Sequence, residues 1–503
     1  MLKRIDNFLN NITMYRVTLY SLIFIWLAAL VLSIFNVLYF APADLIISAA
    51  FILAVCVFSD LVFAFVFEAP TNIDSVYITA AILALIISPV NPLGNLAFLA
   101  WAGILAMASK YIIAPYKKHI FNPAAIAVAL TAAAISQPAN WWIGNLYMAP
   151  FVLIAGLLVV RKIKRFDLVF TFFIAALVSI SLTGPAKNIP TSLYRAVISS
   201  PLMFFSFIML TEPMTTPPRK RMRIVYGALT GLLFAPSIHI GPIYSTPELA
   251  LLLGNLFSYS VGPKKKFILA LLKKRELSPD IFEFSFKPDS KAVFTPGQYM
   301  EWTLGHKGED SRGIRRFFTL ASSPTEKEIK LGVKFYPEPS SFKRSFASMG
   351  EGKTIVASQL AGDFTMPADR KQKLVFIGGG IGITPFRSMI KYLLDTNEPR
   401  PIVLFYSNKF ARDIVYKDVF DQAEEKIGLK TVYLVTDKDS VLPNWCYTGR
   451  INESMIIKEA PDYRERIFYL SGPRGMVLTF EELLKKMGVR RKQIKTDYFP
   501  GFA

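Results

Sequence analysis

The stretch Arg316-Phe-Phe-Thr-Leu-Ala-Ser-Ser-Pro324 places an arginine, an aromatic ring and a hydroxyl on one short segment. The guanidinium of Arg316 can neutralise a phosphate with its planar fork of donors. Phe318 follows on the same strand face, where its ring can stack on a planar cofactor, and the hydroxyl of Thr319 can bond to a ring nitrogen. Together these groups suit a flavin nucleotide. Alone, the pattern more often describes an edge strand with one charged residue, so the rest of the chain decides between the two interpretations.

The composition indicates a membrane protein and excludes several kinds of metal centre. Of the 503 residues, 52% are hydrophobic and only 19% are charged, and the apolar residues crowd into the first half. Two cysteines, Cys56 and Cys446, rule out a disulfide framework and a four-cysteine iron–sulfur cluster built by this chain alone. Three histidines, His119, His239 and His306, are too few for a pair of bis-histidine haems. We therefore expect no metal site.

The first half contains apolar segments of the kind that cross membranes, and the first two are each long enough for a bilayer core of about 30 Å. No cleavage-site pattern follows the first segment, which is too long for the apolar core of a signal peptide, so we interpret it as an anchor. Several later segments are short and contain proline or glycine. The ten predicted spans are 17–40, 43–67, 76–89, 93–108, 123–136, 146–160, 167–183, 195–211, 224–236 and 247–261.

Basic residues in alternate loops predict how these spans are oriented. With the N-terminus in the cytoplasm, every second connection should carry lysine and arginine. The predicted outer loops are nearly bare apart from Lys187 and Arg195, although the inner loop after the second span holds Glu68 and Asp74. The net charge of +20 therefore indicates membrane topology rather than nucleic-acid binding. We expect a bacterial-type inner membrane with the N-terminus and the C-terminal half on its cytoplasmic side. The basic residues of the predicted inner loops are Lys110, Lys117, Lys118, Arg161, Lys162, Lys164, Arg165, Arg219, Lys220, Arg221, Arg223, Lys264, Lys265 and Lys266.

Short, interrupted spans usually mean that non-helical backbone is buried around a site. The segment Phe121-Asn-Pro-Ala-Ala125 starts a span at a proline, which favours a half-helix N-terminus able to hold an anion. Glu68-Ala-Pro-Thr71 and Glu212-Pro-Met-Thr215 each precede a Val-Tyr pair and an apolar run that ends at a proline. A faint internal repeat and a chance match in an apolar sequence are both open interpretations.

The membrane half resembles a family of bacterial redox-pump subunits. It is similar to the B subunit of the sodium-translocating NADH:quinone oxidoreductase and to the D subunit of the Rnf complex over roughly residues 15–262, which implies ten spans. The resemblance rests on Phe121-Asn-Pro-Ala124, on Thr211-Glu-Pro-Met-Thr-Thr-Pro217 and on Val225-Tyr-Gly-Ala228.

One feature of that family is missing here. The family carries FMN covalently on the threonine of a Ser-Gly-Ala-Thr motif, and the matching connection in this chain is only Gln137-Pro-Ala-Asn-Trp-Trp-Ile-Gly144. The resemblance therefore leaves a non-covalent FMN or riboflavin, or a quinone, near Asn122 and Thr215. Alternatively, these two residues cap half-helices and hold no cofactor.

The second half opens with alternating apolar and polar residues, which are typical of half-buried strands. Ile281-Phe-Glu-Phe-Ser-Phe-Lys287 is one such strand, Phe294-Thr-Pro-Gly-Gln-Tyr-Met-Glu-Trp302 is a turn followed by another, and Leu331-Gly-Val-Lys-Phe335 is a third. Short strands at this spacing predict a small antiparallel barrel over 267–367. The loop Ser340-Ser-Phe-Lys343 offers hydroxyls and a cation to a pyrophosphate, although a solvated turn is the ordinary interpretation.

From Lys373 the pattern changes to that of a nucleotide-binding domain, 371–503. The apolar strand Leu374-Val-Phe-Ile377 runs into Gly378-Gly-Gly-Ile-Gly-Ile-Thr-Pro385 and an amphipathic helix. Glycines at such a junction let backbone amides meet a phosphate at the helix N-terminus. Further strands begin at Pro401, Thr431 and Ile467, each followed by a helix or loop. This alternation predicts a doubly wound α/β fold.

The second half resembles the ferredoxin–NADP reductase superfamily over about 267–503. The motifs that carry the likeness are Phe294-x-Pro-Gly-Gln298, Arg316-x-Phe-Thr319, Gly378-Gly-Gly-Ile-Gly-Ile-Thr-Pro385, Ser471-Gly-Pro473 and Asp497-Tyr-Phe-Pro-Gly-Phe502. By this likeness Arg316 binds the flavin phosphate, Phe318 packs on the isoalloxazine and Thr319 faces its N5. Ser341 touches the phosphates. Phe499 covers the flavin face where nicotinamide enters, so Thr319 and Phe499 form the catalytic face.

The same likeness places the nicotinamide nucleotide. Gly379, Gly380 and Thr384 line its site, with Gly472 and Pro473 beside it. Two departures stand out. Ser471 replaces a frequent cysteine, which removes a thiol near the nicotinamide, and Phe318 replaces the commoner tyrosine, which removes a hydroxyl but keeps the stacking.

The sequence therefore predicts a polytopic α-helical membrane domain, 1–262, fused to a β-barrel flavin domain and an α/β nucleotide domain. We expect FAD and NADH or NADPH, with electrons passing into the membrane domain to quinone or a bound flavin, and ion coupling is one option. The alternative is a membrane-anchored reductase of ferredoxin or flavodoxin whose membrane half is a scaffold or transporter. A haem-dependent ferric or oxygen reductase is disfavoured by the three histidines. Lys409 and Arg412 could meet the 2′-phosphate of NADPH, although exposed basic residues are common there.

Overall fold

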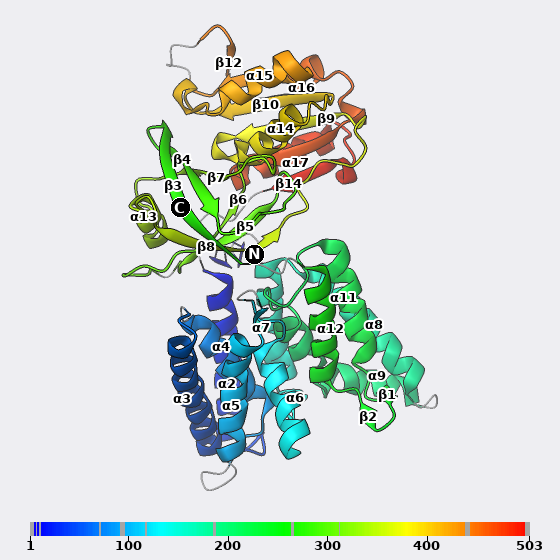
Figure 1. Cartoon of the computed structure of the whole chain (residues 1–503). Helices are drawn as coiled ribbons and strands as arrows, with labels where there is room; N and C mark the ends of the chain where they lie inside the picture. Colours follow the sequence, from blue (N-terminus) through cyan, green and yellow to red (C-terminus); the bar gives the residue numbers. More distant parts are fainter. Residues whose placement is uncertain are drawn as a thin grey trace. The chain divides into compact units, whose positions relative to one another are not determined.

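The computed structural model describes residues 5–6, 8–9, 12–69, 72–90, 96–115, 118–184, 188–262, 266–310, 312–437 and 443–497. Its internal contacts divide the chain into two compact units, Met1–Lys265 and Lys266–Ala503, which we call the helical unit and the reductase unit (Figure 1). Each unit is described by itself.

The helical unit is built from apolar α-helices. Two of them, α6 and α12, begin with a proline directly after a capping side chain: Asn122 accepts hydrogen bonds from two backbone amides of α6, and Thr246 accepts one from α12. The helices are α2 (Met14–Ile34), α3 (Pro42–Val66), α4 (Ile73–Ile86), α5 (Leu96–Ile112), α6 (Pro123–Ile135), α7 (Ala149–Ile163), α8 (Phe166–Thr183), α9 (Ile189–Ile198), α10 (Leu202–Phe204), the π-turn η3 (Phe205–Met209), α11 (Lys220–Leu233) and α12 (Pro247–Val261). A short hairpin, β1 (His239–Ile240) and β2 (Ile243–Tyr244), precedes α12.

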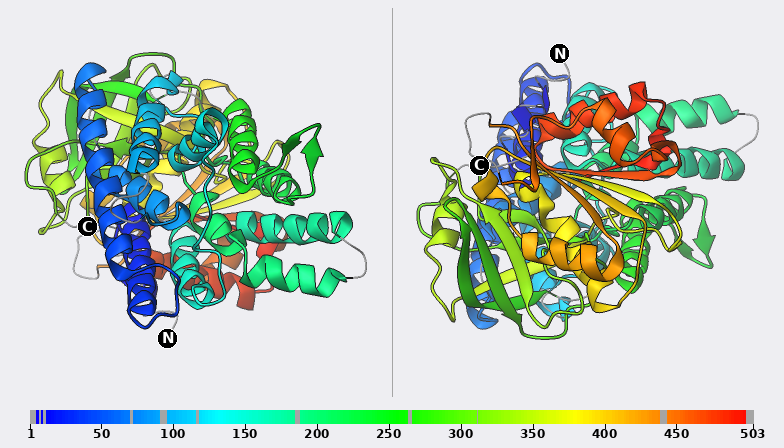
Figure 2. Two further views of the ribbon diagram at one scale, coloured as in Figure 1. Left: turned by 90° about the horizontal axis from the view of Figure 1, so that it is seen from below. Right: turned by 90° about the horizontal axis from the view of Figure 1, so that it is seen from above.

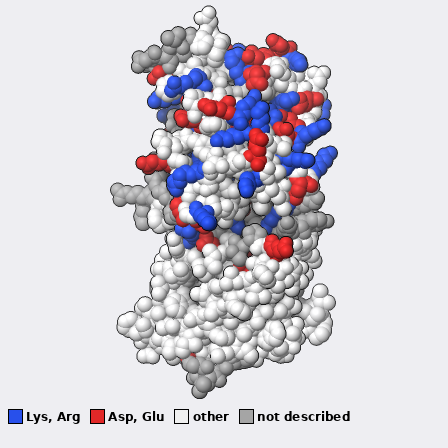
Figure 3. Space-filling model, turned by 60° about the vertical axis from the view of Figure 1, so that its left-hand side comes forward, with Lys and Arg blue, Asp and Glu red and all other residues white. Residues whose placement is uncertain are grey.

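Small residues let helices of this unit approach closely. A Cβ added to Gly231 of α11 would lie 2.5 Å from the carbonyl oxygen of Phe172 in α8, so the two backbones are nearly in contact. In contrast, large apolar side chains such as Phe65 and Leu182 are exposed. Figure 3 shows the lower, helical part of the displayed face almost without Lys, Arg, Asp or Glu. A surface of this kind suits lipid rather than water.

The helices coincide with the predicted apolar segments, but their lengths differ. Three described helices, α2, α3 and α8, are long and apolar enough to cross a membrane, and the bent pair Ile189–Ile198 and Leu202–Met209 would make a fourth. The 57° bend lies in the predicted span 195–211. Membrane character is thus supported, whereas the number of ten spans stays a prediction.

The first part of the reductase unit is a six-stranded antiparallel sheet with the order β6-β5-β8-β3-β4-β7. The two edge strands are joined at one end, because the Ala321 amide donates to the Lys330 carbonyl at 2.8 Å. The strands are β3 (Phe267–Ser278), β4 (Ile281–Pro288), β5 (Tyr299–Thr303), β6 (Arg315–Thr319), β7 (Ile329–Lys334) and β8 (Thr354–Ala361). Strands β3 and β8 were not predicted. The second half of β3 runs through exposed Lys273-Lys-Arg-Glu276, which hides the alternation.

The second part is a six-stranded parallel sheet with the order β12-β11-β10-β9-β13-β14. Helices cover both faces, with α14 and α15 over one hydrophobic core and α16 and α17 over the other, as Figure 2 (right) shows. The predicted doubly wound fold is confirmed. The elements are β9 (Leu374–Gly379), α14 (Thr384–Asp395), β10 (Ile402–Asn408), α15 (Lys417–Ile427), β11 (Lys430–Val435), β12 (Cys446–Thr448), α16 (Glu453–Glu459), β13 (Ile467–Ser471), α17 (Arg474–Lys486) and β14 (Ile494–Asp497).

Candidate functional site

Strand β6 carries the predicted flavin residues, and Arg316 is buried there. Its Nη1 donates to the carbonyls of Arg312 (2.8 Å), Gly313 (3.0 Å) and Arg315 (2.6 Å), which together hold the guanidinium beside the strand. Burial lowers the pKa of Arg316 to about 10, so the side chain still carries its charge at neutral pH. The guanidinium carbon lies 5.1 Å from the centroid of the Phe342 ring. A buried, oriented cation of this kind fits an anionic group such as a phosphate.

Phe318 packs near Phe342, the ring that the Arg316 guanidinium contacts, and Ser341 directly precedes Phe342. The Phe318 ring packs near Phe342 and Phe346, at centroid distances of 6.1 and 6.0 Å. The predicted loop at 340–343 is instead the start of helix α13 (Ser341–Ala347), because the Ser340 hydroxyl caps the amide of Lys343. A hydroxyl followed by residues able to continue a helix is an N-cap signal that a loop interpretation overlooks.

The backbone of Ser341 already holds a carboxylate. Its amide donates to Asp310 Oδ2 at 2.8 Å, and its hydroxyl accepts from the Asp310 amide at 3.0 Å. Burial works against ionisation of Asp310, but the Ser341 amide and the ion pair with Arg312 at 2.9 Å lower its pKa to about 2. Asp310 was not predicted as a site residue. The Ser341 amide, which the likeness assigns to the flavin phosphates, thus already has an acceptor in Asp310.

Thr319 ends β6 and meets the end of the nucleotide domain. Its hydroxyl donates to Asp497 Oδ2 at 3.4 Å, and Asp497 is the last residue of β14. Asp497 opens the tail motif that carries the likeness, but no role was assigned to its carboxylate from the sequence. Phe499 itself lies outside the described residues.

The predicted nicotinamide loops come together at the carboxyl ends of β9 and β13. These strands are neighbours in the sheet although three strands, β10, β11 and β12, lie between them in sequence order, so this is a topological switch point. A Cβ on Gly382 would lie 2.5 Å from Gly472 Cα, and one on Gly379 would meet Met476 Sδ at 2.2 Å and Pro473 Cδ at 3.4 Å. Gly380 adopts a φ of +55°. Gly382 therefore has no room for a side chain, because its Cβ would meet backbone, whereas a Cβ on Gly379 would require the flexible end of Met476 to move.

Thr384 begins α14 on the same side, where its hydroxyl donates to the Ile381 carbonyl at 3.2 Å. The structure thus gathers Gly379, Gly380, Thr384, Gly472 and Pro473 as the likeness implied. Their contact with a nucleotide stays a prediction.

In the helical unit, Glu212 brings the predicted Asn122 and Thr215 together. Asn122 Nδ2 donates to Glu212 Oε2 at 2.9 Å, and Thr215 Oγ1 donates to the same oxygen at 3.0 Å. His119 Nε2 lies 3.3 Å from Glu212 Oε1. The backbone amide of Asn122 donates to Asn255 Oδ1 at 2.8 Å. Asn255 was missed because a lone amide within an apolar helix carries no sequence pattern.

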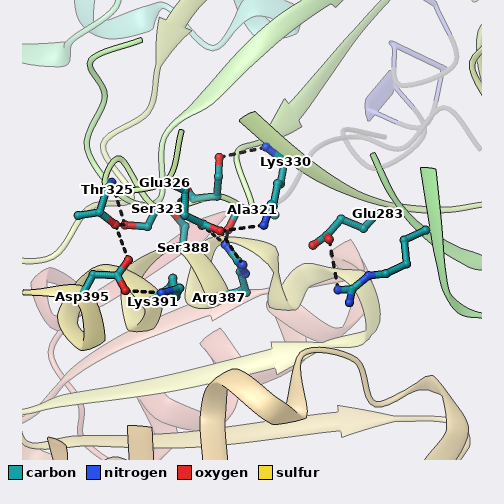
Figure 4. A network of polar contacts seen from close by, with 12 residues as sticks. Glu283, Ala321, Ser323, Thr325, Glu326, Lys330, Arg387, Ser388, Lys391 and Asp395 are labelled. Atoms are coloured by element: carbon teal, nitrogen blue, oxygen red, sulfur yellow. Dashed lines mark hydrogen bonds and ion pairs between the residues drawn. The ribbon is translucent and has the colours of Figure 1, made fainter. Parts of the chain in front are cut away.

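A polar network joins the two parts of the reductase unit, as Figure 4 shows. Arg387 of α14 pairs with both carboxylate oxygens of Glu326, and its Nη1 also donates to the Ala321 carbonyl at 3.0 Å. Ser388 donates to the Ser322 carbonyl at 2.6 Å. Because Ala321 and Ser322 come directly after Thr319 and Leu320, the network ties α14 to the segment that follows β6.

Comparisons with known proteins find a match for each half of the chain. Residues 139–262 match the NQR2, RnfD, RnfE family, and residues 376–482 match the oxidoreductase NAD-binding domain. A flavohemoprotein of Burkholderia sp. (strain TH2) is 29% identical over 239 residues, 47% of this chain and 59% of that protein. A glycine betaine monooxygenase reductase subunit of Pseudomonas aeruginosa (strain UCBPP-PA14) is 27% identical over 227 residues, 44% and 60% respectively. The chain thus spans about 60% of the length of these relatives.

Solved structures give similar matches. The ferredoxin reductase in carbazole 1,9a-dioxygenase is 26% identical, with a TM-score of 0.40 over 47% of this chain and 69% of that one. The family matches confirm both resemblances: a membrane domain of the NQR2/RnfD type is fused to a reductase module of the NAD(P)H-dependent flavin type. They also confirm the oxidoreductase class and the expected cofactors of the reductase module, FAD with NADH or NADPH.

Proposed function

We propose that this chain is a membrane-bound flavoprotein that oxidises NADH or NADPH and passes the electrons through its helical unit to an acceptor such as quinone or a second bound flavin. The observation that carries the proposal is the presence, in one chain, of a reductase module and a helical unit that has its own buried polar cluster at Glu212.

In the reductase unit the residues of β6 would hold the flavin: Arg316 would neutralise a phosphate, the Phe318 ring would flank the isoalloxazine, and the Thr319 hydroxyl would lie toward N5. When bound, FAD would supply hydride acceptance from the nicotinamide and release of the two electrons one at a time, which frees one proton for each hydride. Thr319 and the Asp497 carboxylate, 3.4 Å apart, provide a donor–acceptor pair that can hold this proton.

The nucleotide lies at the switch point of the parallel sheet. The glycines at 379, 380 and 472 let its pyrophosphate approach the backbone amides at the start of α14, where the helix dipole favours negative charge. Thr384 fixes the nicotinamide end. Hydride transfer needs no acid or base from the chain, only a near-attack pose with the reacting atoms about 3–3.5 Å apart.

In the helical unit the acceptor site is the cluster around Glu212. A carboxylate that accepts from an amide, a hydroxyl and an imidazole can take up or release the protons that accompany quinone or flavin reduction. Asn122 also caps α6, so the site lies at a helix N-terminus that favours an anionic ring oxygen. Coupling of this step to ion movement across an inner membrane is part of the same proposal.

Proteoliposomes containing the purified chain test this function. We expect NADH or NADPH to reduce an added quinone, and Glu212→Gln to lower that rate about tenfold while the flavin is still reduced at the wild-type rate. Glu68→Gln, at an exposed carboxylate of the same unit, is the matched control. Quinone reduction that Glu212→Gln leaves unchanged would place the acceptor elsewhere.

A second candidate function is supported by the relatives. The relative from Pseudomonas aeruginosa is named as the reductase subunit of a monooxygenase, so its kind of module serves a separate acceptor protein. In this chain that function would be a membrane-anchored reductase of ferredoxin or flavodoxin, whose helical unit holds no redox cofactor. Rapid reduction of either carrier, together with no reduction of quinone, would favour it.

A further inference from the structure

Gly332 of β7 is the point at which the nucleotide domain rests directly on the backbone of the antiparallel sheet. A Cβ built there would lie 2.8 Å from the Thr384 methyl, 2.8 Å from the Tyr416 hydroxyl and 3.1 Å from Ile381 Cδ1. Thr384 and Ile381 belong to the proposed nicotinamide loop. Across the strand pair, Gly332 lies opposite Glu283 of β4. Because Gly332 has no side chain, it leaves a space on the sheet that Thr384, Tyr416 and Ile381 of the nucleotide domain fill. We call this space the Gly332 socket.

Tyr416 enters this socket from an unusual backbone conformation. It has φ +62° and ψ 20° at the N-cap of α15, a left-handed region that residues with a side chain adopt rarely. Its ring is buried, with the guanidinium carbon of Arg387 5.6 Å from its centroid. Burial and the Glu283 carboxylate raise its pKa well above the usual value, so the phenol stays neutral. Strain of this kind persists where surrounding contacts require it, often at functional sites.

A short hydrogen-bonded path leads from the socket to the flavin strand. Lys330, two residues before Gly332, accepts from the Ala321 amide at 2.8 Å, and its own amide donates to Ser322 Oγ at 3.1 Å. Ala321 and Ser322 come directly after Thr319 and Leu320. A shift of the nicotinamide loop at Gly332 is therefore a shift relative to β6, because the backbone between them has little freedom.

Two further sets of contacts hold the two domains in place. Arg387 pairs with Glu326, as Figure 4 shows. The Ser278 hydroxyl donates to Asp413 at 3.2 Å, and Lys334 pairs with Asp413 at 3.3 Å. An added methyl group at Gly332 would meet side-chain atoms of Thr384, Tyr416 and Ile381. Since Thr384 Cγ2 is bonded directly to Cβ, we expect its displacement to shift the loop that carries Thr384.

We propose that the Gly332 socket sets the distance between the nicotinamide loop and the flavin strand, with Tyr416 and Glu283 as positioning residues. This inference rests on the proposed oxidation of NADH or NADPH. It concerns the distance across which the hydride is transferred and not the affinity for the nucleotide. The Gly332 socket meets the loop at Ile381 and Thr384, whereas Lys409 and Arg412, which we expect at the adenosine 2′-phosphate, lie after β10. A misplacement of about 1 Å can slow such a step about a hundredfold.

The test is Gly332→Ala in the full chain, purified in detergent with its flavin. We expect flavin reduction by excess NADH or NADPH to slow at least tenfold in stopped-flow measurements, and the isotope effect with 4-deuterated nucleotide to rise. The dissociation constant of ADP-ribose, measured by calorimetry, should change less than twofold. Gly350→Ala is the matched control, because a Cβ there meets nothing within 4 Å.

A second substitution separates positioning from folding. Gly332→Ala combined with Tyr416→Phe removes one of the two atoms at 2.8 Å, so it should recover part of the lost rate. If Gly332→Ala does not retain flavin, Tyr416→Phe alone carries the test, with a slower flavin reduction and a larger isotope effect expected. Wild-type reduction rates in these variants, or equal losses of rate and of ADP-ribose affinity, would overturn the inference. A wild-type flavin that neither nucleotide reduces would instead refute the proposed function, and the inference with it.

Discussion

At the scale of single residues, Arg316 and Asp310 have opposite effects on the proposed flavin phosphate. Arg316→Ala removes a buried cation, and a charged hydrogen bond contributes roughly 1.5–3 kcal/mol, so FAD should bind about ten- to a hundredfold more weakly. Asp310→Asn removes a competing negative charge from the amide of Ser341 and should strengthen binding. Equilibrium dialysis of FAD measures both. Arg344→Ala, at an exposed arginine of the same domain, should change nothing, and equal losses in all three variants would contradict the assignment.

The loop after β10 carries two basic residues that we expect to meet the 2′-phosphate of NADPH. Lys409 and Arg412 are exposed and lie against the Phe410 ring at 4.8 and 4.7 Å, whereas the nearby Asp413 carboxylate is engaged by Lys334. We expect Arg412→Ala to raise the KM for NADPH about tenfold and to leave the KM for NADH nearly unchanged, because only NADPH carries a 2′-phosphate. Steady-state kinetics with both nucleotides at low and high salt check this. An equal change for both would show that the loop does not contact the 2′-position.

At the scale of elements, the attachment of α14 to the antiparallel sheet depends on pH through Glu326. Burial opposes ionisation of Glu326, but hydrogen bonds from Arg387 lower its pKa to about 2. A carboxylate with a lowered pKa stabilises the fold above its unfolded pKa and loses this effect as the pH falls toward the folded value. Glu326→Gln should therefore cost about 3 kcal/mol at neutral pH, and the difference from wild type should shrink below pH ~4.5.

This difference can be measured by thermal unfolding at several pH values between 7 and 3, with flavin release as the signal. Glu481→Gln provides the control, since the Glu481–Lys485 pair of α17 lies on the surface at 2.7 Å, where such pairs contribute little. A pH-independent difference for Glu326→Gln would mean that the pair contributes by packing and not by charge.

The elements themselves were predicted where local sequence is strong. The buried strand Leu374–Gly379 and the glycine turn after it follow directly from their composition, as does α6 from its Asn-Pro start. The start of α13 was missed, because Ser340 is equally at home in a turn and at a helix cap. Strand β8 was missed because its partners lie far away in sequence, and pairing rather than propensity decides such a strand.

At the scale of the whole molecule, the basic loops predict that both termini of the helical unit face the cytoplasm, so the reductase unit should lie there too. The two cysteines allow a direct check, since Cys56 is fully buried and Cys446 is partly exposed on β12. A membrane-impermeant maleimide should label Cys446 in inverted vesicles and not in right-side-out ones. Because burial raises the pKa of Cys446, labelling should be slow at pH 7 and faster at pH 9. Cys446→Ser provides the blank, and labelling from the outer side would reverse the orientation.

The sequence by itself determined the two-part plan of this protein, its apolar first half, the flavin strand and the glycine loop, because these depend on composition and on contacts between near neighbours. It also indicated Asn122 and Thr215 before any partner was known. Tertiary structure alone revealed that Glu212 and Asn255 join them, that Asp497 meets Thr319, and that Tyr416 fills the space above Gly332. Asn122 lies 90 residues from Glu212 and 133 from Asn255, and Thr319 lies 178 residues from Asp497. No local pattern records which distant side chain folding will bring beside another.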